Sequence, residues 1–171
     1  EATREALEEL VSEGKIRWYG WSTDDPARAR IFAQGPHCAA IQQSLSVLTG
    51  NRETLQVCEA ENLASLNRGP LIKGLLTGKF DQQATFPDND TRVRWNLRDG
   101  LEATQLAQFA AVRDILTSHG RTPAQGALCW LWSLSERTIP LPGFKTVAQV
   151  EENAGALHCP LLTAAEMTEI E

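Results

Sequence analysis

Short apolar runs and longer amphipathic stretches alternate along the first part of the chain. Residues Glu1–Glu13 carry alanine, leucine and valine at helical spacing and predict a helix. The run Ile16–Trp21 then predicts a buried strand, followed by a helix over Pro26–Ala33. The same order returns in a strand over Ala39–Gln43 and a helix over Arg52–Leu66. This part of the chain therefore predicts repeated strand–helix units behind an opening helix.

The second half continues the pattern with a longer interruption. The apolar run Pro70–Gly74 predicts a third strand, and the polar stretch Asp81–Gly100 separates it from helices over Ala103–His119 and Pro123–Leu134. Residues Thr138–Leu141 predict a fourth strand, after which a last helix begins. Because each of the four strands is followed by at least one helix, the pattern predicts an α/β fold whose sheet is parallel, with helical crossovers.

The length of the chain bears on how that sheet is arranged. With 171 residues, of which 42% are hydrophobic, it has the size of a single domain. An eight-unit barrel needs about 250 residues, whereas a doubly wound sheet can be built from fewer, so length alone favours the open sheet. Against it, neither G-x-G-x-x-G nor a phosphate-loop pattern follows any strand.

The chain has no initiator methionine and no N-cap ahead of its first helix, so we expect it to begin inside an element, with an upstream portion missing.

Charge and cysteine content narrow the class of function. The formal net charge of −6 offers no broad basic surface, so nucleic acid is not expected as a partner. No apolar run approaches the roughly 18 residues of a membrane span and no signal peptide opens the chain, so a cytoplasmic protein without membrane attachment is expected. The cysteines never form a C-x-x-C pair and the histidines have no partner at ligand spacing, so we expect reduced thiols and no metal site. The cysteines are Cys38, Cys58, Cys129 and Cys159.

The stretch IPLPGFKTVAQVEEN, residues 139–153, carries a clear chemical signal. Thr146 and Gln149 stand at the spacing of a capping box, which would satisfy the free amides at the start of a helix. The helix N-terminus also favours an anion, and Lys145 beside the threonine hydroxyl suits a phosphate monoester, with Gln149 and Asn153 able to hydrogen-bond a purine edge. The capping and phosphate interpretations both remain open from these residues alone. The side of this helix expected to be buried consists of Val147, Val150, Ala154 and Leu157.

Other stretches could contact a ligand as well. RGPLIKGLLTGKF, residues 68–80, combines glycines that permit close backbone approach with Lys79, which could meet a pyrophosphate; a tight loop with solvated lysines explains it equally well. Ser22 and Gln42 lie at the ends of neighbouring predicted strands, where ligands bind in barrels and open sheets, although either could be a cap or turn residue. In the long polar stretch, Arg92 or Arg94 could reach a phosphate, or the whole stretch could be a solvated loop.

Together these segments resemble a known family. EALEELVSEGKIRWYGWST, AAIQQSLSVL, RGPLIKGLLTGKF, TPAQGALCWLWS and IPLPGFKTVAQVEENAGAL are similar, in order and spacing, to the second half of an aldo/keto reductase. The resemblance implies an α/β fold of the parallel (β/α) barrel, TIM type. Residues 1–171 would form one domain, the C-terminal half of that barrel, with roughly the last four βα units and most of the NADP-binding segments. The family binds NADPH in an extended conformation without a Rossmann fingerprint, so the missing G-x-G-x-x-G is expected.

The resemblance also implies which residues contact NADP(H). Ser22 and Gln42 match residues that hold the nicotinamide carboxamide, while Leu45 stands where members often have an aromatic residue that stacks on the ring. The loop Leu71–Lys79 matches the segment that wraps the pyrophosphate. The closing segment takes the 2′-phosphate and the adenosine, where Gln149 replaces a frequent arginine, so we expect a weaker preference for NADPH over NADH. The implied set is Ser22, Gln42, Leu71, Gly74, Leu76, Lys79, Gly143, Lys145, Thr146, Gln149, Glu152 and Asn153.

The same resemblance places the proton-transfer chemistry outside this chain. The family transfers a hydride between NADPH and an aldehyde or ketone, using Asp, Tyr, Lys and His side chains from the first half of the barrel, and the single tyrosine, Tyr19, does not match that motif. We therefore expect no catalytic residues here, and oxidoreductase activity on a small carbonyl substrate only in the complete protein. The alternative is a non-catalytic NADP-binding or assembly module, as the family's channel-associated β subunits suggest. A half barrel exposes strand edges and its inner face, so we also expect self-association.

Overall fold

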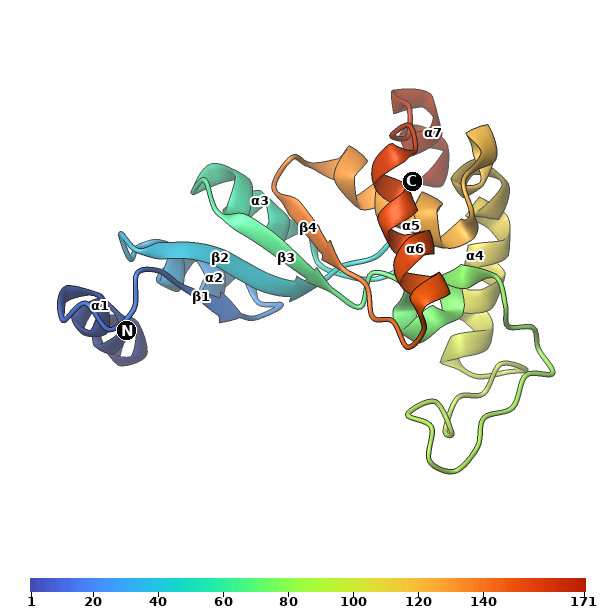
Figure 1. Ribbon diagram of the computed structural model, residues 1–171, viewed down its shortest axis with the longest axis horizontal. Helices are drawn as coiled ribbons and strands as arrows, with labels where there is room; N and C mark the ends of the chain where they lie inside the picture. Colours follow the sequence, from blue (N-terminus) through green and yellow to red (C-terminus); the bar gives the residue numbers. More distant parts are fainter.

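The computed structural model describes residues 1–171 and has a parallel four-stranded sheet at its centre (Figure 1). The strands are β1 (Tyr19–Ser22), β2 (Cys38–Ser44), β3 (Ala64–Arg68) and β4 (Thr138–Leu141), and their order in the sheet is their order in the chain. A doubly wound sheet reverses its strand order at a switch point, whereas a (β/α) barrel adds each strand to the same side. The observed order is therefore that of a stretch of barrel wall, as the family resemblance implies.

Helices connect and cover these strands. They are α1 (Ala2–Ser12), α2 (Pro26–Ala33), α3 (Arg52–Ala60), α4 (Leu101–Leu116), α5 (Pro123–Leu134), α6 (Val147–Gly155) and α7 (Ala164–Ile170), with short 3₁₀ segments η1 (Ile72–Thr77), η2 (Ser118–Gly120) and η3 (Ala156–His158). The molecule is elongated, with α1 at one end and α4 to α7 at the other (Figure 1). No helix is both long enough and apolar enough to cross a membrane.

The third strand lies earlier in the chain than the apolar pattern predicts. The predicted helix Arg52–Leu66 ends at Ala60, and Asn62 turns the chain with a φ of 57° into β3. The predicted strand Pro70–Gly74 is wrong, because Pro70 and Leu71 form a turn and the residues from Ile72 onward belong to η1. The cause is the polarity of β3, whose helix-facing Ser65 and Asn67 are fully buried and meet through hydrogen bonds rather than apolar contacts.

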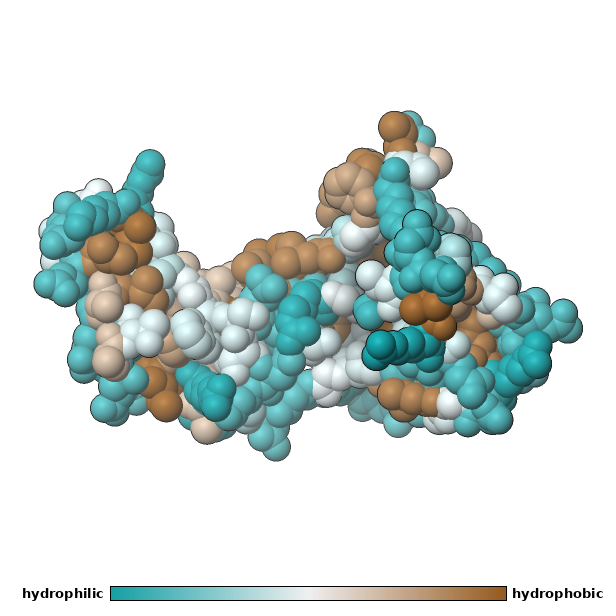
Figure 2. All heavy atoms as spheres, turned by 90° about the horizontal axis from the view of Figure 1, so that it is seen from below, coloured by the Kyte–Doolittle hydropathy of each residue, from teal (hydrophilic) through white to brown (hydrophobic).

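The two faces of the sheet have different environments. On the helix side, Trp21 of β1 stacks on Phe32 of α2 with 4.1 Å between the ring centroids. On the opposite side, register partners Ser22, Gln42, Leu66 and Ile139 form a row across all four strands. Figure 2 shows this side as a hollow between the two ends of the molecule, with apolar side chains on its floor. Ile139 is 46% exposed there, so the face that would line a barrel interior is open.

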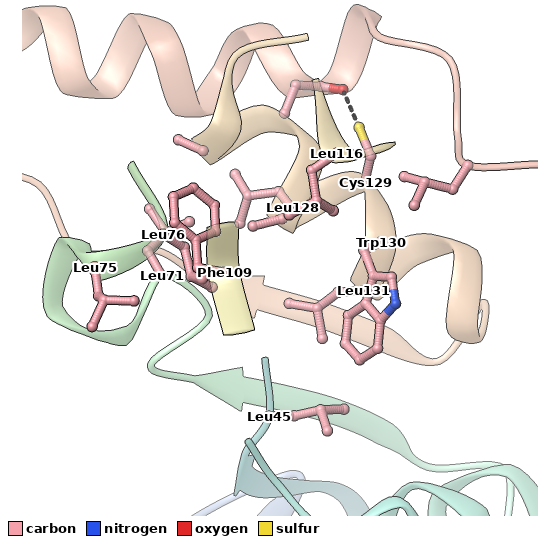
Figure 3. Packing of buried hydrophobic residues seen from close by; sticks show 14 of the residues in the cluster. Leu45, Leu71, Leu75, Leu76, Phe109, Leu116, Leu128, Cys129, Trp130 and Leu131 are labelled. Atoms are coloured by element: carbon pink, nitrogen blue, oxygen red, sulfur yellow. Dashed lines mark hydrogen bonds between the residues drawn. The ribbon is translucent and has the colours of Figure 1, made fainter. Parts of the chain in front are cut away.

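Helix α5 organises the larger of the cores. All its residues from Gly126 to Leu131 are buried, and they pack against Leu71, Leu75 and Leu76 of the loop after β3 and against Phe109 and Leu116 of α4 (Figure 3). Gly126 permits the close approach of α4, because a Cβ atom there would lie 2.1 Å from the carbonyl oxygen of Leu116. A smaller core between β1, β2, α2 and α3 contains Tyr19, Ala29, Phe32, Cys38, Ile41, Val57, Cys58 and Leu63.

Helix α6 is attached to α5 largely through polar groups. Gln125 Nε2 donates to the Glu152 carbonyl at 3.1 Å, and Cys129 Sγ lies 3.6 Å from the Ala156 carbonyl. The prediction of a buried Val147, Val150, Ala154 and Leu157 stripe is wrong in this chain. Val147 is 73% and Leu157 71% exposed, because α6 follows the edge strand β4 and no further strand or helix covers that side.

Candidate functional site

A pocket of about 530 Å³ opens beside the carboxyl ends of β3 and β4. Its walls come from the loop after β3, from the loop after β4 with the start of α6, and from the long segment before α4. In Figure 1, η1 and the first turn of α6 lie side by side there. The lining residues are Gly69, Pro70, Leu71, Lys73, Gly74, Thr77, Lys79, Thr91, Arg92, Leu141, Gly143, Phe144, Lys145, Gln149, Glu152 and Asn153. Ligands of parallel α/β proteins bind at this edge of the sheet.

The wall after β3 is a strained turn. Ile72, Lys73 and Gly74 have φ values of 46°, 50° and 94°, which places all three in the left-handed region. For the two non-glycine residues this conformation costs on the order of 1–3 kcal/mol each, so the surrounding contacts must enforce it. Gly74 N donates to Leu71 O at 2.8 Å, and Thr77 Oγ1 donates to Gly74 O at 2.7 Å. The turn presents the Lys73 side chain and the Gly74 backbone to the pocket.

The wall after β4 is the N-terminus of α6. Thr146 is its N-cap and accepts a hydrogen bond from Gln149 N at 3.3 Å. Gln149 Oε1 accepts from Lys145 N at 2.6 Å, so the side chain reaches back across the cap and leaves its amide NH₂ group without a protein partner. Asn153 Nδ2 is a buried donor with no partner, on a residue that lines the pocket. Capping and pocket formation therefore use the same segment, and two amide groups remain for a ligand.

The third wall is the strap, the segment Asp81–Gly100 that precedes α4. The strap is folded around Phe80, Phe86 and Trp95, whose rings meet edge to face at centroid distances of 5.1 to 6.3 Å. Arg92 lies between the faces of Phe80 and Phe86 and pairs with Asp90 at 2.7 Å. Hydrogen bonds from the Arg92 side chain and backbone hold the pKa of the Asp90 carboxyl well below its usual range. The expectation of a solvated loop is thus wrong for this part of the strap.

The charges around the pocket favour an anion. Lys73, Lys79 and Lys145 line it together with Arg92, whose charge is balanced by Asp90, and Glu152 is the acidic lining residue. Three lysines against one carboxylate leave an excess of positive charge. At Gly143 a Cβ atom would meet nothing within 4 Å, so space remains beside Lys145. Cationic side chains, free amide donors and a helix N-terminus are a donor set that fits the phosphates and base of a dinucleotide.

The structure brings most of the predicted cofactor residues together. Eight of the twelve line the pocket: Leu71, Gly74, Lys79, Gly143, Lys145, Gln149, Glu152 and Asn153. Of the other four, Thr146 caps α6 beside the pocket and Leu76 is fully buried in the core. Ser22 and Gln42 lie outside the pocket but are register partners on the open face of the sheet. Leu45, where an aromatic residue is frequent, is 1% exposed and belongs to the core, so it presents no surface to a ring.

The sequence patterns missed several lining residues, among them Pro70, Thr77, Thr91 and Phe144. The sequence offers Arg92 as a possible phosphate contact beside the alternative of a solvated loop, and the structure pairs its charge with Asp90 instead. A signal was available for Lys73, since the glycines on either side of it in residues 69–74 indicate a tight turn. For Thr91 the sequence contains no comparable signal.

The titratable groups away from the pocket have structural partners. Tyr19 donates from its hydroxyl to Glu8 Oε1 at 2.6 Å, and Glu8 Oε2 lies 2.6 Å from His37 Nδ1. Burial, together with the Glu8 carboxylate, raises the pKa of Tyr19.

The four cysteines are free thiols, and no group of three or more histidine, cysteine and acidic side chains gathers as a metal site. Burial raises the pKa of Cys58 and of Cys129 to about 11, which keeps both protonated.

Comparisons with known proteins agree with this geometry. An aldo-keto reductase of Schizosaccharomyces pombe, named for NADP⁺, is 30% identical over 167 residues, which is 93% of this chain and 48% of that protein. The chloroplastic pyridoxal reductase of Arabidopsis thaliana is 27% identical over 98% of the chain and 46% of its own length. The structure of a glycerol dehydrogenase from Gluconobacter oxydans superposes with a TM-score of 0.82 at 26% identity, over 98% of this chain and 51% of the other.

A further solved structure carries the cofactor. An aldo/keto reductase from Klebsiella pneumoniae in complex with NADP and acetate matches with a TM-score of 0.66 at 28% identity, over 98% of this chain and 52% of that one. The chain therefore spans about half the length of the relatives it matches. The profile of the aldo/keto reductase family matches residues 1–171 without interruption. Strand order, pocket position and these matches agree, and the chain belongs to the aldo/keto reductase family.

Proposed function

We propose that this chain is the NADP(H)-binding half of an oxidoreductase that reduces aldehydes and ketones to alcohols. The observation that carries the proposal is the pocket itself, in which three lysines and two amide groups without protein partners surround a space at the carboxyl edge of a parallel sheet. NADPH held there would supply the hydride for reduction of a carbonyl group. The residues described below bind and orient the nucleotide.

The wall after β4 suits the adenosine end of the nucleotide. Lys145 and Thr146 stand at the N-terminus of α6, where a 2′-phosphate would meet a full charge, a hydroxyl and the helix dipole. The free amide of Gln149 and the unpartnered Asn153 Nδ2 can donate to phosphate or to base nitrogens. Gln149 contributes no charge, so the discrimination between NADPH and NADH would rest on Lys145.

The nicotinamide end would lie toward β1. Ser22 and Gln42 are register partners on the open face, and β1 lies three strand spacings, about 14 Å, from β4. Lys73, Lys79 and the Gly74 backbone lie between these ends and suit a pyrophosphate. An extended dinucleotide could therefore run along the carboxyl edge, with its amide group at Ser22 and Gln42.

Proton donation would come from another part of the complete protein. Tyr19 lies on the helix side of β1, and its hydroxyl is already bound to Glu8. We therefore propose that residues 1–171 form one C-terminal half-barrel domain, and that the isolated chain binds nucleotide without turnover. The second half would cover the open face of the sheet and the exposed stripe of α6.

A second candidate function is a non-catalytic NADP-binding or assembly module. The observation that favours it is the exposed apolar surface, since Ile139, Val147 and Leu157 are each more than two-fifths exposed and invite a partner. A longer protein that binds NADPH tightly yet reduces no carbonyl compound would support this candidate against the first.

Calorimetric titration of the purified chain with NADPH and with NADH tests the proposal. Replacing Lys145 with Met should weaken NADPH binding by about 10–100-fold, the equivalent of a charge-assisted hydrogen bond, and should affect NADH much less. Lys15→Met is the matched control, because Lys15 pairs with Glu13 on the surface away from the pocket. No saturable binding of either nucleotide, or equal loss in both lysine variants, would contradict the proposed site.

A further inference from the structure

Each of the three guanidinium nitrogens of Arg92 donates a hydrogen bond within the protein. Its Nε and Nη2 donate to the Asp90 carboxylate at 2.8 and 2.7 Å, and its Nη1 donates to the carbonyl oxygen of Lys73 at 3.1 Å. The guanidinium carbon lies 5.0 Å from the centre of the Phe80 ring and 4.7 Å from that of Phe86. The side chain is only 15% exposed although it lines the pocket. Its charge is balanced and its plane is fixed.

The carbonyl that Arg92 holds belongs to the centre of the strained turn. Lys73 is the middle of the three consecutive left-handed residues. Fixing its carbonyl fixes the plane of the peptide that links it to Gly74, and so the direction of the Gly74 N–H. The Gly74 N–H of that same peptide donates to Leu71 O, so both ends of the peptide are held, and the Gly74 carbonyl accepts from Thr77 Oγ1. The strap therefore reaches across 19 residues to secure the wall of the pocket.

Asp90 determines where the guanidinium points. It accepts from the Arg92 backbone N at 2.9 Å as well as from the side chain, which closes a local ring. Lys145 also lowers the pKa of Asp90, as the smallest of the contributions. The negative charge of Asp90 by itself would oppose an anion in the neighbouring pocket, so its position against Arg92 calls for another role.

We propose that Arg92 is a positioning residue, which clamps the Lys73 carbonyl so that Lys73 and Gly74 keep the shape of an anion-binding wall, while Asp90 holds Arg92 in that position. Arg92 itself does not contact the phosphate. The inference rests on the proposed function for the identity of the ligand, and on the contacts of the strap for the clamp. A direct charge effect predicts that removal of the Asp90 charge strengthens anion binding, whereas the clamp predicts that it weakens anion binding.

The test compares Arg92→Lys, Asp90→Asn and the control Arg94→Lys by NADPH calorimetry and by hydrogen exchange without ligand. Lysine keeps the charge but cannot bind Asp90 through two nitrogens and reach Lys73 as well, so affinity should fall about tenfold. Asp90→Asn should weaken binding by a similar factor even though it removes a negative charge. Both variants should exchange the amides of residues 72–78 faster than wild type, while those of α5 stay protected. Arg94, the other arginine that the sequence offers as a phosphate contact, is exposed and does not line the pocket, so Arg94→Lys should change neither.

Wild-type affinity in Arg92→Lys, or tighter binding in Asp90→Asn, would overturn the clamp in favour of a plain charge effect. Unchanged exchange over residues 72–78 in both variants would overturn it as well. Failure of wild type to bind NADPH would contradict the proposed function instead, and the exchange measurement would still decide the role of Arg92. Melting curves and the protection of α5 exclude global unfolding as the cause of a loss.

Discussion

Replacing Glu166 with Gln removes one charge from a buried network that fastens α7 to the rest of the molecule. The Arg121 side chain is fully buried and donates to Glu166 Oε1 at 2.9 Å, to Leu116 O at 3.0 Å and to Pro160 O at 2.9 Å. Glu166 also closes the capping box with Thr163. Glu166 Oε1 accepts from Arg121 and Oε2 accepts from Thr163, whereas glutamine has a single acceptor oxygen, so the substitution removes the charge together with one of these two contacts.

The magnitude follows from burial. Removing one partner of a fully buried ion pair costs about 3–5 kcal/mol, and since Glu166 is 14% exposed and glutamine keeps an acceptor, about 2 kcal/mol is expected. An unfolding entropy of about 2.1 cal/mol/K per residue over 171 residues is about 0.36 kcal/mol/K. The melting temperature should therefore fall by about 5–6 °C at pH 7.

The pH dependence of the melting temperature distinguishes the loss of the Glu166 charge from a general loss of stability. Hydrogen bonds from the Ser118 hydroxyl, the Thr163 amide and hydroxyl, and Arg121 lower the pKa of Glu166 to about 2. A carboxylate with a lowered pKa stabilises the fold above its ordinary pKa, 4.5, and loses that contribution as the pH falls toward 2. Thermal melts of wild type and Glu166→Gln should therefore converge between pH 4.5 and 2. Glu169→Gln, on the exposed side of α7, is the control. A gap that stays constant with pH, or no gap at pH 7, would refute the reasoning.

Three more substitutions test the packing and the open surfaces. Gly126→Ala should destabilise the fold by about 1–3 kcal/mol or more in urea unfolding, because its Cβ would lie 2.1 Å from the Leu116 carbonyl, whereas Gly143→Ala has open space and should unfold like wild type. Tyr19→Phe should lower the melting temperature at pH 7, and this loss should shrink as the pH falls below 4.5, since the Tyr19 hydrogen bond is the main cause of the lowered pKa of Glu8; a loss that does not change with pH would contradict that cause. Val147→Lys should reduce self-association in sedimentation velocity without changing the melting temperature, because that side chain is 73% exposed, and an unchanged sedimentation profile would exclude the α6 stripe as the contact.

Hydrophobic periodicity located most of the elements because their buried faces are apolar. Strand β4 and helix α5 have the predicted bounds, and β2 extends its prediction by one residue at each end. Hydrophobic periodicity failed at β3, where the buried side chains Ser65 and Asn67 are polar and hydrogen-bond to each other. Helix α7 was not predicted, although Thr163 and Glu166 stand at capping-box spacing ahead of it.

Some residues of the candidate site could likewise be predicted from the sequence, and others could not. Gln149 and Asn153 were predictable because helix spacing places them on one side of α6, and Lys145 because it stands directly before the N-cap of that helix. The pairing of Ser22 with Gln42 needed the strand register, and the role of Arg92 needed a contact across 19 residues. No local pattern contains either of these. The exposed α6 stripe is the opposite case. Its apolar pattern predicts a packing partner, and residues 1–171 contain no element that packs there.

The measurement that tests the central claim most directly is amide chemical-shift mapping of the isotope-labelled chain during titration with NADP⁺. We expect saturable shifts over residues 69–79 and 143–153, which contain the lining of the pocket, and at Ser22 and Gln42 on the open face. Shifts that gather instead around the second hollow beside Trp18 and Leu63, or no saturable shifts at all, would contradict it.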